Sequence, residues 1–286
     1  MREDTQMALD AEADGLAGTA AAAAALPHRD DEPITCYERR RYLLARARAE
    51  GRVTVTGAAQ ELHMSVETVR RDLKVLEAHG LVRREYGVAY PVETAGFESD
   101  LAARESEWLP EKRRIAAEAV HHLDDAETIF IDEGYLPQLV AQQLPTETAL
   151  TVVTASLPVA SMLAMRPSVS VVVLGGRLRG RTLATVDRWA TEMLSDFVID
   201  LAFMGANGIS RMHGLTTPDP AVAAVKSAAM RASRRRIFIG AHLKFSAVSF
   251  ARFAEVSEFE ALITDTRLSL SEAHRYMQLG PTVIRV

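Results

Sequence analysis

The chain has 286 residues, of which 48% are hydrophobic and 25% charged, so it can bury sizeable cores and has room for about two domains. Its net charge of -5 argues by itself against a nucleic-acid partner. The single cysteine, Cys36, excludes an intramolecular disulfide and fits a reducing compartment. The acidic start does not resemble a signal peptide, and the apolar runs are too short or too interrupted to span a membrane. We therefore expect a cytoplasmic protein.

The charge is spread unevenly along the chain. Residues 1–35 hold two basic and eight acidic residues, residues 36–92 hold eleven and seven, and residues 93–286 hold twenty and twenty-three. A basic segment inside an acidic chain is a modest electrostatic signal for phosphate. Residues 1–33 are rich in alanine and acids and poor in large apolar side chains, so we expect them to be disordered or to form a frayed helix.

The basic segment opens with two predicted helices. The first runs from Tyr37 to Glu50 and is ended by Gly51, and a very short strand over 53–55 follows. Thr56 is the expected cap of the second helix, which reaches Leu62. The first helix should bury its apolar side chains and leave its arginines in solvent: Tyr42, Leu43, Leu44 and Ala47 inside, and Arg39, Arg40, Arg41, Arg46 and Arg48 outside.

The stretch from Ser65 to His79 has the pattern of a DNA recognition helix. Ser65 can cap its start, and Gly80 suits the left-handed residue that ends a helix. One face is apolar and the opposite face is basic: Val66, Val69, Leu73 and Leu76 form the first, and Glu67, Thr68, Arg71 and Lys74 the second, with Arg70 on its flank. A major groove admits such a helix, and arginine can bond two acceptors of guanine. A lone helix of this kind is more often a solvated surface helix, so its neighbours decide.

Those neighbours complete a winged helix-turn-helix over residues 34–92. A tight turn at His63-Met64 joins the second helix to the recognition helix. After it, two short strands around Tyr86-Gly87 predict a hairpin. A hairpin in this position is a wing, and its Arg83 and Arg84 could reach phosphates.

This segment resembles the DNA-binding domain of DeoR-type bacterial transcriptional regulators. The family signature Ser-x-x-Thr-Ile/Val-Arg-Arg-Asp-Leu is matched from Ser65 to Leu73, and Gly80-Leu81 and Arg84 follow as in the family. The wing departs, because Val88 stands where the family's His-Gly-Gly-Ala turn has its second glycine, and valine tolerates positive φ poorly. The expected partner is double-stranded operator DNA, and the expected DNA-binding residues are Ser65, Glu67, Thr68, Arg70, Arg71, Lys74, Arg83, Arg84 and Tyr86.

Residues 93–107 have the mixed polar composition of a linker, and beyond them helices and apolar strands alternate. This alternation predicts a mostly parallel α/β domain over residues 108–286. Ligands of such sheets bind at the carboxyl ends of the strands. The expected strands cover residues 128–131, 150–153, 169–174, 201–204, 237–239 and 261–264, and the expected helices residues 111–123, 136–144, 157–165, 221–232 and 271–278, with 191–195 inside another.

Polar and glycine-rich loops follow several of these strands. Gly175-Gly176 and Gly205 open loops of the kind that bind anions through backbone N–H groups, and Lys226 and Lys244 add positive charge. For any one glycine loop, an ordinary β-to-α turn is the more common explanation.

The whole of residues 108–286 resembles the effector-sensing domain of the same family. That domain is related to ribose-phosphate isomerases and typically binds phosphorylated sugars. The resemblance implies these effector-binding residues: Asp132, Gly134, Tyr135, Thr154, Ser156, Gly175, Gly176, Asp200, Gly205, Lys226 and Lys244.

Three departures remove polar partners from that expected site. Tyr135 and Leu136 replace two hydroxyl residues of the family pattern Asp-x-Gly-Thr-Thr. Ala155 replaces an asparagine, and Ala241 replaces an aspartate three residues before Lys244. The sequence therefore favours a different effector or a weakened sensing site.

Other charged groups carry no clear signal. His121 and His122 indicate a solvated or partly buried pair rather than a metal site. The arginines of 231–236 indicate a solvated helix end. Arg177, Arg179 and Arg181 either form a solvated loop or face an anionic effector.

We predict a sequence-specific transcriptional regulator, a repressor of carbohydrate metabolism genes that a small anionic or sugar-like metabolite releases. We expect a homo-oligomer, no membrane contact, no metal and no cofactor, and no enzymatic activity. Two alternatives stay open. One is a sugar-phosphate isomerase-like enzyme with an appended DNA-binding domain, and the other is a DNA-binding regulator with a degenerate sensor.

Overall fold

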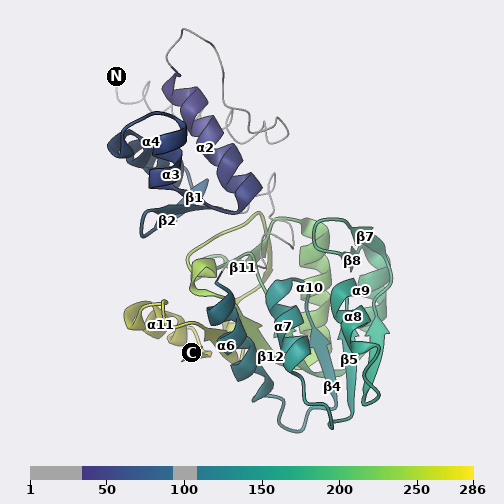
Figure 1. Ribbon diagram of the computed structural model, residues 1–286. Coiled ribbons are helices and arrows are strands. Elements are labelled where there is room, and N and C mark those ends of the chain that lie inside the picture. The colour runs from purple at the N-terminus through teal and green to yellow at the C-terminus, as the bar shows by residue number, and fades with distance from the viewer. Residues whose placement is uncertain (1–33, 93–107) are drawn as a thin grey trace. The chain divides into compact units, whose positions relative to one another are not determined.

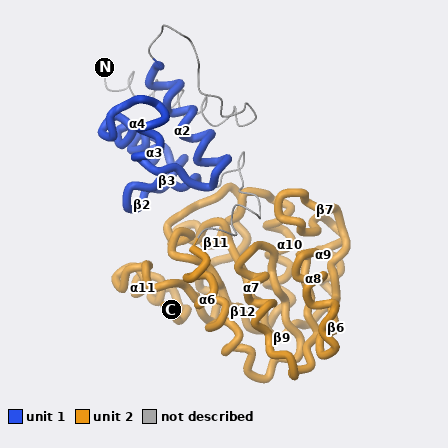
Figure 2. The backbone as a smooth tube through the Cα atoms, viewed as in Figure 1, with its two compact units in different colours: residues 1–99 blue, residues 100–286 orange. Residues whose placement is uncertain are grey.

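The computed structural model describes residues 34–92 and 108–286, so the predicted disordered tail (1–33) and linker (93–107) lie outside the described residues. The chain forms two compact units, residues 1–99 and 100–286 (Figure 2). Each unit has its own hydrophobic core.

The first unit is a winged helix-turn-helix. Its three helices are α2 (Cys36–Glu50), α3 (Val55–Glu61) and α4 (Val66–Ala78) (Figure 1). A small antiparallel sheet has the order β1-β3-β2, from β1 (Val53–Thr54), β2 (Val82–Glu85) and β3 (Val88–Pro91). The predicted cap Thr56 was wrong: the Thr54 side chain accepts the Gly57 N–H at 3.1 Å, so the helix starts two residues earlier.

The arginines of α2 are not all in solvent as predicted. The apolar prediction holds, because Tyr42, Leu43, Leu44 and Ala47 are buried. Arg39, however, is also buried, with 9% of its surface exposed. It is buried because Asp72 of α4, a residue that the apolar-stripe pattern left out, supplies a buried carboxylate to pair with it.

The wing turns at Tyr86-Gly87, where the sequence predicted the hairpin. Glu85 pairs with Val88 across the hairpin, so the loop consists of Tyr86 and Gly87. Both have positive φ, +48° and +81°, which is the backbone of the tight hairpin turn that follows the twist of its strands. Val88 therefore lies in β3 with ordinary strand backbone, and the missing second glycine is no obstacle to the turn.

The second unit is built on a seven-stranded parallel sheet with the order β15-β14-β12-β9-β4-β5-β6. Its strands are β4 (Thr128–Ile131), β5 (Leu150–Thr154), β6 (Val169–Val173), β9 (Ile199–Met204), β12 (Ser233–Ile239), β14 (Ala261–Thr264) and β15 (Thr282–Arg285).

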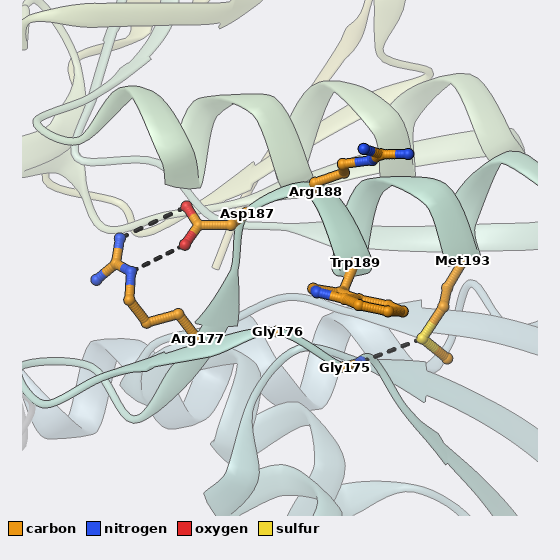
Figure 3. Close-up of a pocket in the computed structure, with 7 residues that line it drawn as sticks. All are labelled: Gly175, Gly176, Arg177, Asp187, Arg188, Trp189 and Met193. Carbon is orange, nitrogen blue, oxygen red and sulfur yellow. Dashed lines mark hydrogen bonds and ion pairs between the residues drawn. The ribbon is translucent and has the colours of Figure 1, made fainter.

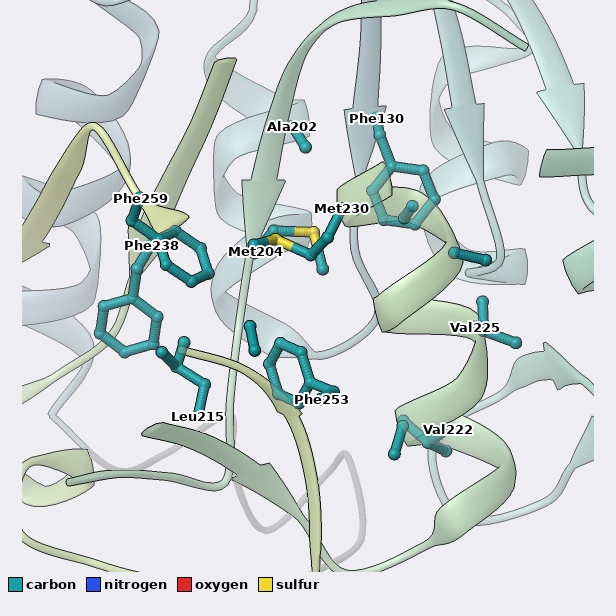
Figure 4. Packing of buried hydrophobic residues seen from close by; sticks show 14 of the residues in the cluster. Phe130, Ala202, Met204, Leu215, Val222, Val225, Met230, Phe238, Phe253 and Phe259 are labelled. Atoms are coloured by element: carbon teal, nitrogen blue, oxygen red, sulfur yellow. The ribbon is translucent and has the colours of Figure 1, made fainter. Parts of the chain in front are cut away.

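Helices cover both faces of this sheet (Figure 1). Ile129 and Ile131 of β4 pack with α6 (Leu109–Val120), α7 (Tyr135–Gln143) and α8 (Leu157–Leu163). Phe130, between them, packs into the other core with α9 (Arg188–Ser195), α10 (Pro220–Ala232) and α11 (Leu270–Met277), as Figure 4 shows in part. Successive side chains of a strand point to opposite faces, so burial on both faces explains the continuous apolar strands of the sequence.

Short strands that lack a strong hydrophobic pattern were not predicted. They are β7 (Arg177–Arg179) with β8 (Ala184–Val186), and β10 (Gly208–Ser210), β11 (Gly214–Thr217) and β13 (Ala251–Ala254), while short 3₁₀ turns form at His242–Lys244 and Val256–Glu258. The prediction of a solvated helix end at 231–236 was wrong in part, because β12 begins at Ser233. Arg235 on that strand pairs with Asp124 at 2.9 Å and with Glu260 at 2.8 Å.

The strand order reverses between β4 and β9. From β4 the chain moves outward through β5 to β6, and from β9 it moves the other way through β12 and β14 to β15. Such a switch point, at the carboxyl ends of parallel strands, is where open α/β sheets bind their ligands.

Candidate functional site

The recognition helix α4 presents its polar face to solvent. The Ser65 hydroxyl accepts the Thr68 N–H at 3.1 Å, as predicted for a cap. Val69, Leu73 and Leu76 have no exposed surface, whereas Glu67, Arg70, Arg71 and Lys74 are exposed. Gly80 has φ +67°, the left-handed residue expected after the helix. These four α4 side chains, all predicted to contact DNA, are therefore accessible.

A buried ion cluster fixes this helix to α2. Asp72 Oδ2 lies 2.5 Å from Arg39 Nε, and Asp72 Oδ1 lies 3.1 Å from Arg40 Nε. The hydrogen bond to Asp72 raises the pKa of Arg39 above its ordinary value. Asp72 thus holds the recognition helix in its orientation against α2. The sequence gives little sign of this role, because the two arginines that pair with Asp72 lie more than 30 residues before it.

The wing is tied to the recognition helix by Arg84. Its Nε lies 2.8 Å from Glu77 Oε2, and its backbone N–H donates to Glu77 Oε1 at 2.9 Å. Arg83 lies 3.6 Å from Glu85, and Tyr86 at the tip of the turn is 92% exposed. Of the wing residues predicted to contact DNA, Arg84 thus has a structural role, and Tyr86 is almost fully exposed.

At the switch point of the second unit, the structure gathers several of the predicted effector residues into one buried cluster. Asp132, which follows β4, forms an ion pair with Lys226 of α10. The same carboxylate accepts the backbone N–H of Gly205, which follows β9, at 2.8 Å. Glu133 Oε1 lies 3.7 Å from Lys226 Nζ. Asp132 and Lys226 are each 2% exposed, so one ammonium group faces two carboxylates away from water.

Unpaired polar atoms lie on Glu133, which belongs to this cluster, and on two further segments. Among the described residues, Glu133 Oε2, Gln138 Nε2 and Thr217 Oγ1 are buried without a hydrogen-bond partner. Buried polar atoms are rarely left unpaired, because each then loses its hydration without compensation. Glu133 and Gln138 lie on the loop and helix that follow β4, and Thr217 ends β11, three residues before α10 begins, so a polar ligand could satisfy them. None of the three was among the residues expected to bind the effector.

Other predicted residues near this cluster have structural partners. The Thr154 hydroxyl donates to the Ile131 carbonyl at 2.7 Å, and Ser156 caps α8 by accepting the Val159 N–H. Gly134 has φ +114°, which favours glycine before α7. Tyr135 is half-buried, with Lys112 Nζ 5.6 Å from the centre of its ring.

Gly175 and Gly176 lie apart, in a surface pocket of about 690 Å³ (Figure 3). Its other lining residues are Arg177, Asp187, Arg188, Trp189 and Met193. Gly176 has φ +137°, and a Cβ there would lie 2.1 Å from the Val186 carbonyl oxygen, so close packing requires this glycine. Arg177 pairs with Asp187 at 2.8 Å, and Arg179 with Asp219 at 3.0 Å.

Asp200 does not belong with the other effector residues. It lies near the amino end of β9, whereas Gly205 follows the carboxyl end of the same strand. Its carboxylate accepts the Thr128 hydroxyl at 2.7 Å and the N–H groups of Glu127 and Thr128. The Thr128 hydroxyl is the main reason that the pKa of Asp200 lies below its ordinary value. This carboxylate therefore joins the amino ends of two strands, and its inclusion in the effector site was wrong.

Lys244 lies at the end of a short turn after β12, beside a buried His–Asp pair. His242 Nδ1 is 2.9 Å from Asp265, which follows β14. Burial favours the neutral form of Asp265, but the hydrogen bonds from His242 outweigh it, so the pKa of Asp265 is lowered. The indole of Trp108 packs edge-on to His242, with 4.9 Å between ring centres.

Within residues 34–92 and 108–286, no cluster of three or more His, Cys, Asp or Glu could hold a metal ion. His121 and His122 both lie beside Glu118, at 3.7 and 3.3 Å. No helix in the described part of the chain is long and apolar enough to cross a membrane.

An accessible recognition helix and wing, in one chain with a parallel α/β unit that has a polar cluster at its switch point, define a DNA-binding regulator with a ligand-sensing domain. Comparison of the chain with known protein families gives the same class. Residues 39–94 match the DeoR-like helix-turn-helix domain, and residues 108–266 match the DeoR C terminal sensor domain. The chain belongs to the DeoR family of transcriptional regulators.

Individual relatives cover most of the chain. The HTH-type transcriptional regulator GlpR of Haloferax volcanii is 32% identical over 82% of this chain and 92% of its own length. The Glycerol-3-phosphate regulon repressor of Escherichia coli is 26% identical over 80% and 90%. A ribose 5-phosphate isomerase A structure from Methanocaldococcus jannaschii is similar over 47% of this chain and 53% of that chain, with 15% identity and a TM-score of 0.35.

Proposed function

We propose that this protein is a repressor of carbohydrate metabolism genes, a cytoplasmic regulator and not an enzyme, released from its operator by a small hydroxylated metabolite. Relatives named as repressors, among them CsqR of Escherichia coli at 30% identity, support the direction of control. The exposed polar face of α4 would enter the major groove, with Arg71 and Lys74 as its cationic centre.

The effector would bind at the switch point, and we propose that it is a neutral sugar or polyol rather than a sugar phosphate. The observation that carries this proposal is the ion pair of Lys226, whose charge is already matched by Asp132 and exceeded when Glu133 is included. A phosphate would meet an excess of negative charge there and lose hydration with few compensating donors. Hydroxyl groups could instead donate to Glu133 Oε2 and accept from Gln138 Nε2, atoms that have no other partner among the described residues.

A thermal-shift and calorimetry comparison tests this proposal. The ligands are neutral sugars and polyols on one side and their monophosphates on the other, with the wild type, Glu133→Gln and the exposed control Glu147→Gln. We expect the wild type to prefer a neutral compound, and Glu133→Gln to lose part of that affinity while gaining affinity for a phosphate. Tight phosphate binding by the wild type, unchanged in Glu133→Gln, would contradict the neutral effector while leaving the repressor intact.

DNA binding is tested separately. The protein should select an operator sequence from a pool of random duplexes. Adding the effector that calorimetry identifies should then dissociate the protein from that operator. A protein that selects no sequence would overturn the repressor itself, and isomerase turnover of a sugar phosphate would support the enzyme alternative.

A further inference from the structure

We propose that the second unit pairs with a second copy of this chain through the outer edge of β6, so that the two seven-stranded sheets join into one. Strand β6 is the last strand of the sheet and, among the described residues, pairs only with β5. The inference is independent of the proposed effector.

The printed hydrogen bonds define which backbone groups of β6 face outward. The Leu150 N–H donates to the Ser168 carbonyl, and the Leu174 N–H donates to the Thr154 carbonyl. Residues of a parallel strand alternate in the side to which both backbone groups point. Ser170 and Val172 therefore face β5, and the N–H and C=O groups of Val171 and Val173 point to the open edge.

Within its own five residues, strand β6 lacks the residue types that prevent an edge strand from pairing with another chain. Its sequence, Val-Ser-Val-Val-Val, has no charge, proline or glycine, and Val173 is 38% exposed. Such a strand is a template for pairing with another chain unless something covers it. The opposite edge strand β15 differs, because it contains the charged Arg285, although a proline precedes both strands (Pro167 and Pro281).

A second copy fits this edge better than an unrelated strand for reasons of symmetry. Two identical edge strands related by a two-fold axis run antiparallel, and the axis can pass beside Val171 so that Val169 of each copy lies opposite Val173 of the other. The outward N–H and C=O of each Val171 then bond to the same residue of the other copy. Each β6 edge is then covered by the other, so assembly through this edge stops at a dimer.

Exposed apolar side chains lie at the two ends of the same strand. Met165, before its amino end, is 86% exposed, and Trp189, beside the pocket at its carboxyl end, is 72% exposed (Figure 3). Antiparallel pairing brings the amino end of each β6 to the carboxyl end of the other, so Met165 of one copy approaches the Trp189 pocket of the second. The charges around that pocket would not make two copies repel each other, because the ion pairs Arg177–Asp187 and Arg188–Glu192 each contain both signs.

Proline substitution at matched edges provides the test. Val171→Pro removes an outward N–H and leaves the β5 ladder intact. Val283→Pro is the control on β15, where the Thr282 N–H donates to the Glu260 carbonyl and Val283 must therefore face outward. Sedimentation velocity of the full chain over a concentration series gives the dissociation constant of the dimer, and thermal unfolding checks that both variants fold.

We expect a wild-type dimer at micromolar concentration, weakened at least about tenfold by Val171→Pro and unaffected by Val283→Pro. In a Trp108→Phe background, acrylamide should quench Trp189 less as the dimer forms. A monomeric wild type, open-ended association, or equal effects of the two proline variants would overturn the proposal. So would a dimer that Val171→Pro leaves unchanged.

Discussion

Arg39 of α2 and Asp72 of the recognition helix form a buried ion pair with 2.5 Å between Nε and Oδ2, and Arg40 shares the same carboxylate at 3.1 Å. Removing one partner of such a cluster leaves buried charge without compensation. We expect Asp72→Ala to lower the free energy of unfolding of the DNA-binding unit by about 3–5 kcal/mol. Glu67→Gln, on the exposed face of the same helix, should change it by less than about 0.5 kcal/mol. Urea unfolding of the two variants measures the difference, and equal stabilities would show that the cluster does not hold α4.

Arg71 lies on the exposed face of α4, outside that cluster. Arg71→Ala should weaken operator binding by about 1–3 kcal/mol in a sequence-selective manner if the side chain reads a guanine. Arg113→Ala, an exposed arginine of α6, is the matched control and should bind as the wild type does. Gel-shift titrations at one salt concentration make the comparison. If both variants retain full affinity, α4 does not read the operator through Arg71.

Arg84 allows a structural role of the wing to be separated from a phosphate contact. Arg84→Ala should weaken binding to all sequences similarly and reduce the salt dependence by about one phosphate contact. Glu77→Gln removes the ion pair at 2.8 Å but keeps the arginine, so its salt dependence should match the wild type. Anisotropy titrations between low and high salt give both slopes. Identical slopes in all three proteins would limit Arg84 to holding the wing against α4.

Tyr135 and Leu136 must be tested apart, because the structure gives them different surroundings. Leu136 is only 8% exposed and packs in the core of α6 and α7, so Leu136→Thr should destabilise the second unit by about 2 kcal/mol or more. Tyr135 is half-buried, and Tyr135→Thr should keep the fold and improve binding of sugar phosphates, because it replaces a large ring by a small hydroxyl side chain. Calorimetry with both single variants distinguishes them, and phosphate affinity that Tyr135→Thr abolishes would assign the ring itself to the site.

Asp265 should make the stability of the second unit depend on acid pH. Its pKa is lowered in the folded protein, against the effect of burial, by hydrogen bonds from His242. A carboxyl with a depressed folded pKa stabilises the fold above its unfolded value of about 3.9 and loses that contribution as the pH falls below it. Thermal unfolding between pH 6 and pH 3 should therefore show a steeper acid decline in the wild type than in Asp265→Asn. Parallel declines would exclude Asp265 as a source of this dependence.

Local features of both units could be predicted from the sequence because they depend on neighbours along the chain. The Ser65 cap, the apolar stripe of α4 and the left-handed Gly80 follow from residue types at fixed spacing. The strands β4 and β14 have the predicted bounds, since continuous apolar runs between helices leave little freedom. The dense signature from Ser65 to Leu73 likewise indicates the family through residue types alone.

Tertiary structure alone decided which distant residues meet. Asp132 reaches Lys226 and Gly205 only because the strand order reverses between β4 and β9. This reversal brings segments more than 70 residues apart together at the carboxyl ends of the strands. Asp200 matched the family's sensor domain in sequence as those residues did. Five residues of extended strand nevertheless separate it from Gly205, so it lies at the amino end of β9 and away from the cluster. The same topology placed Gly175 and Gly176 on a separate surface and left β6 at the outside of the sheet. Hydrophobic periodicity specifies elements and their buried faces, but pairwise electrostatics across the sheet is set by the order in which the strands assemble.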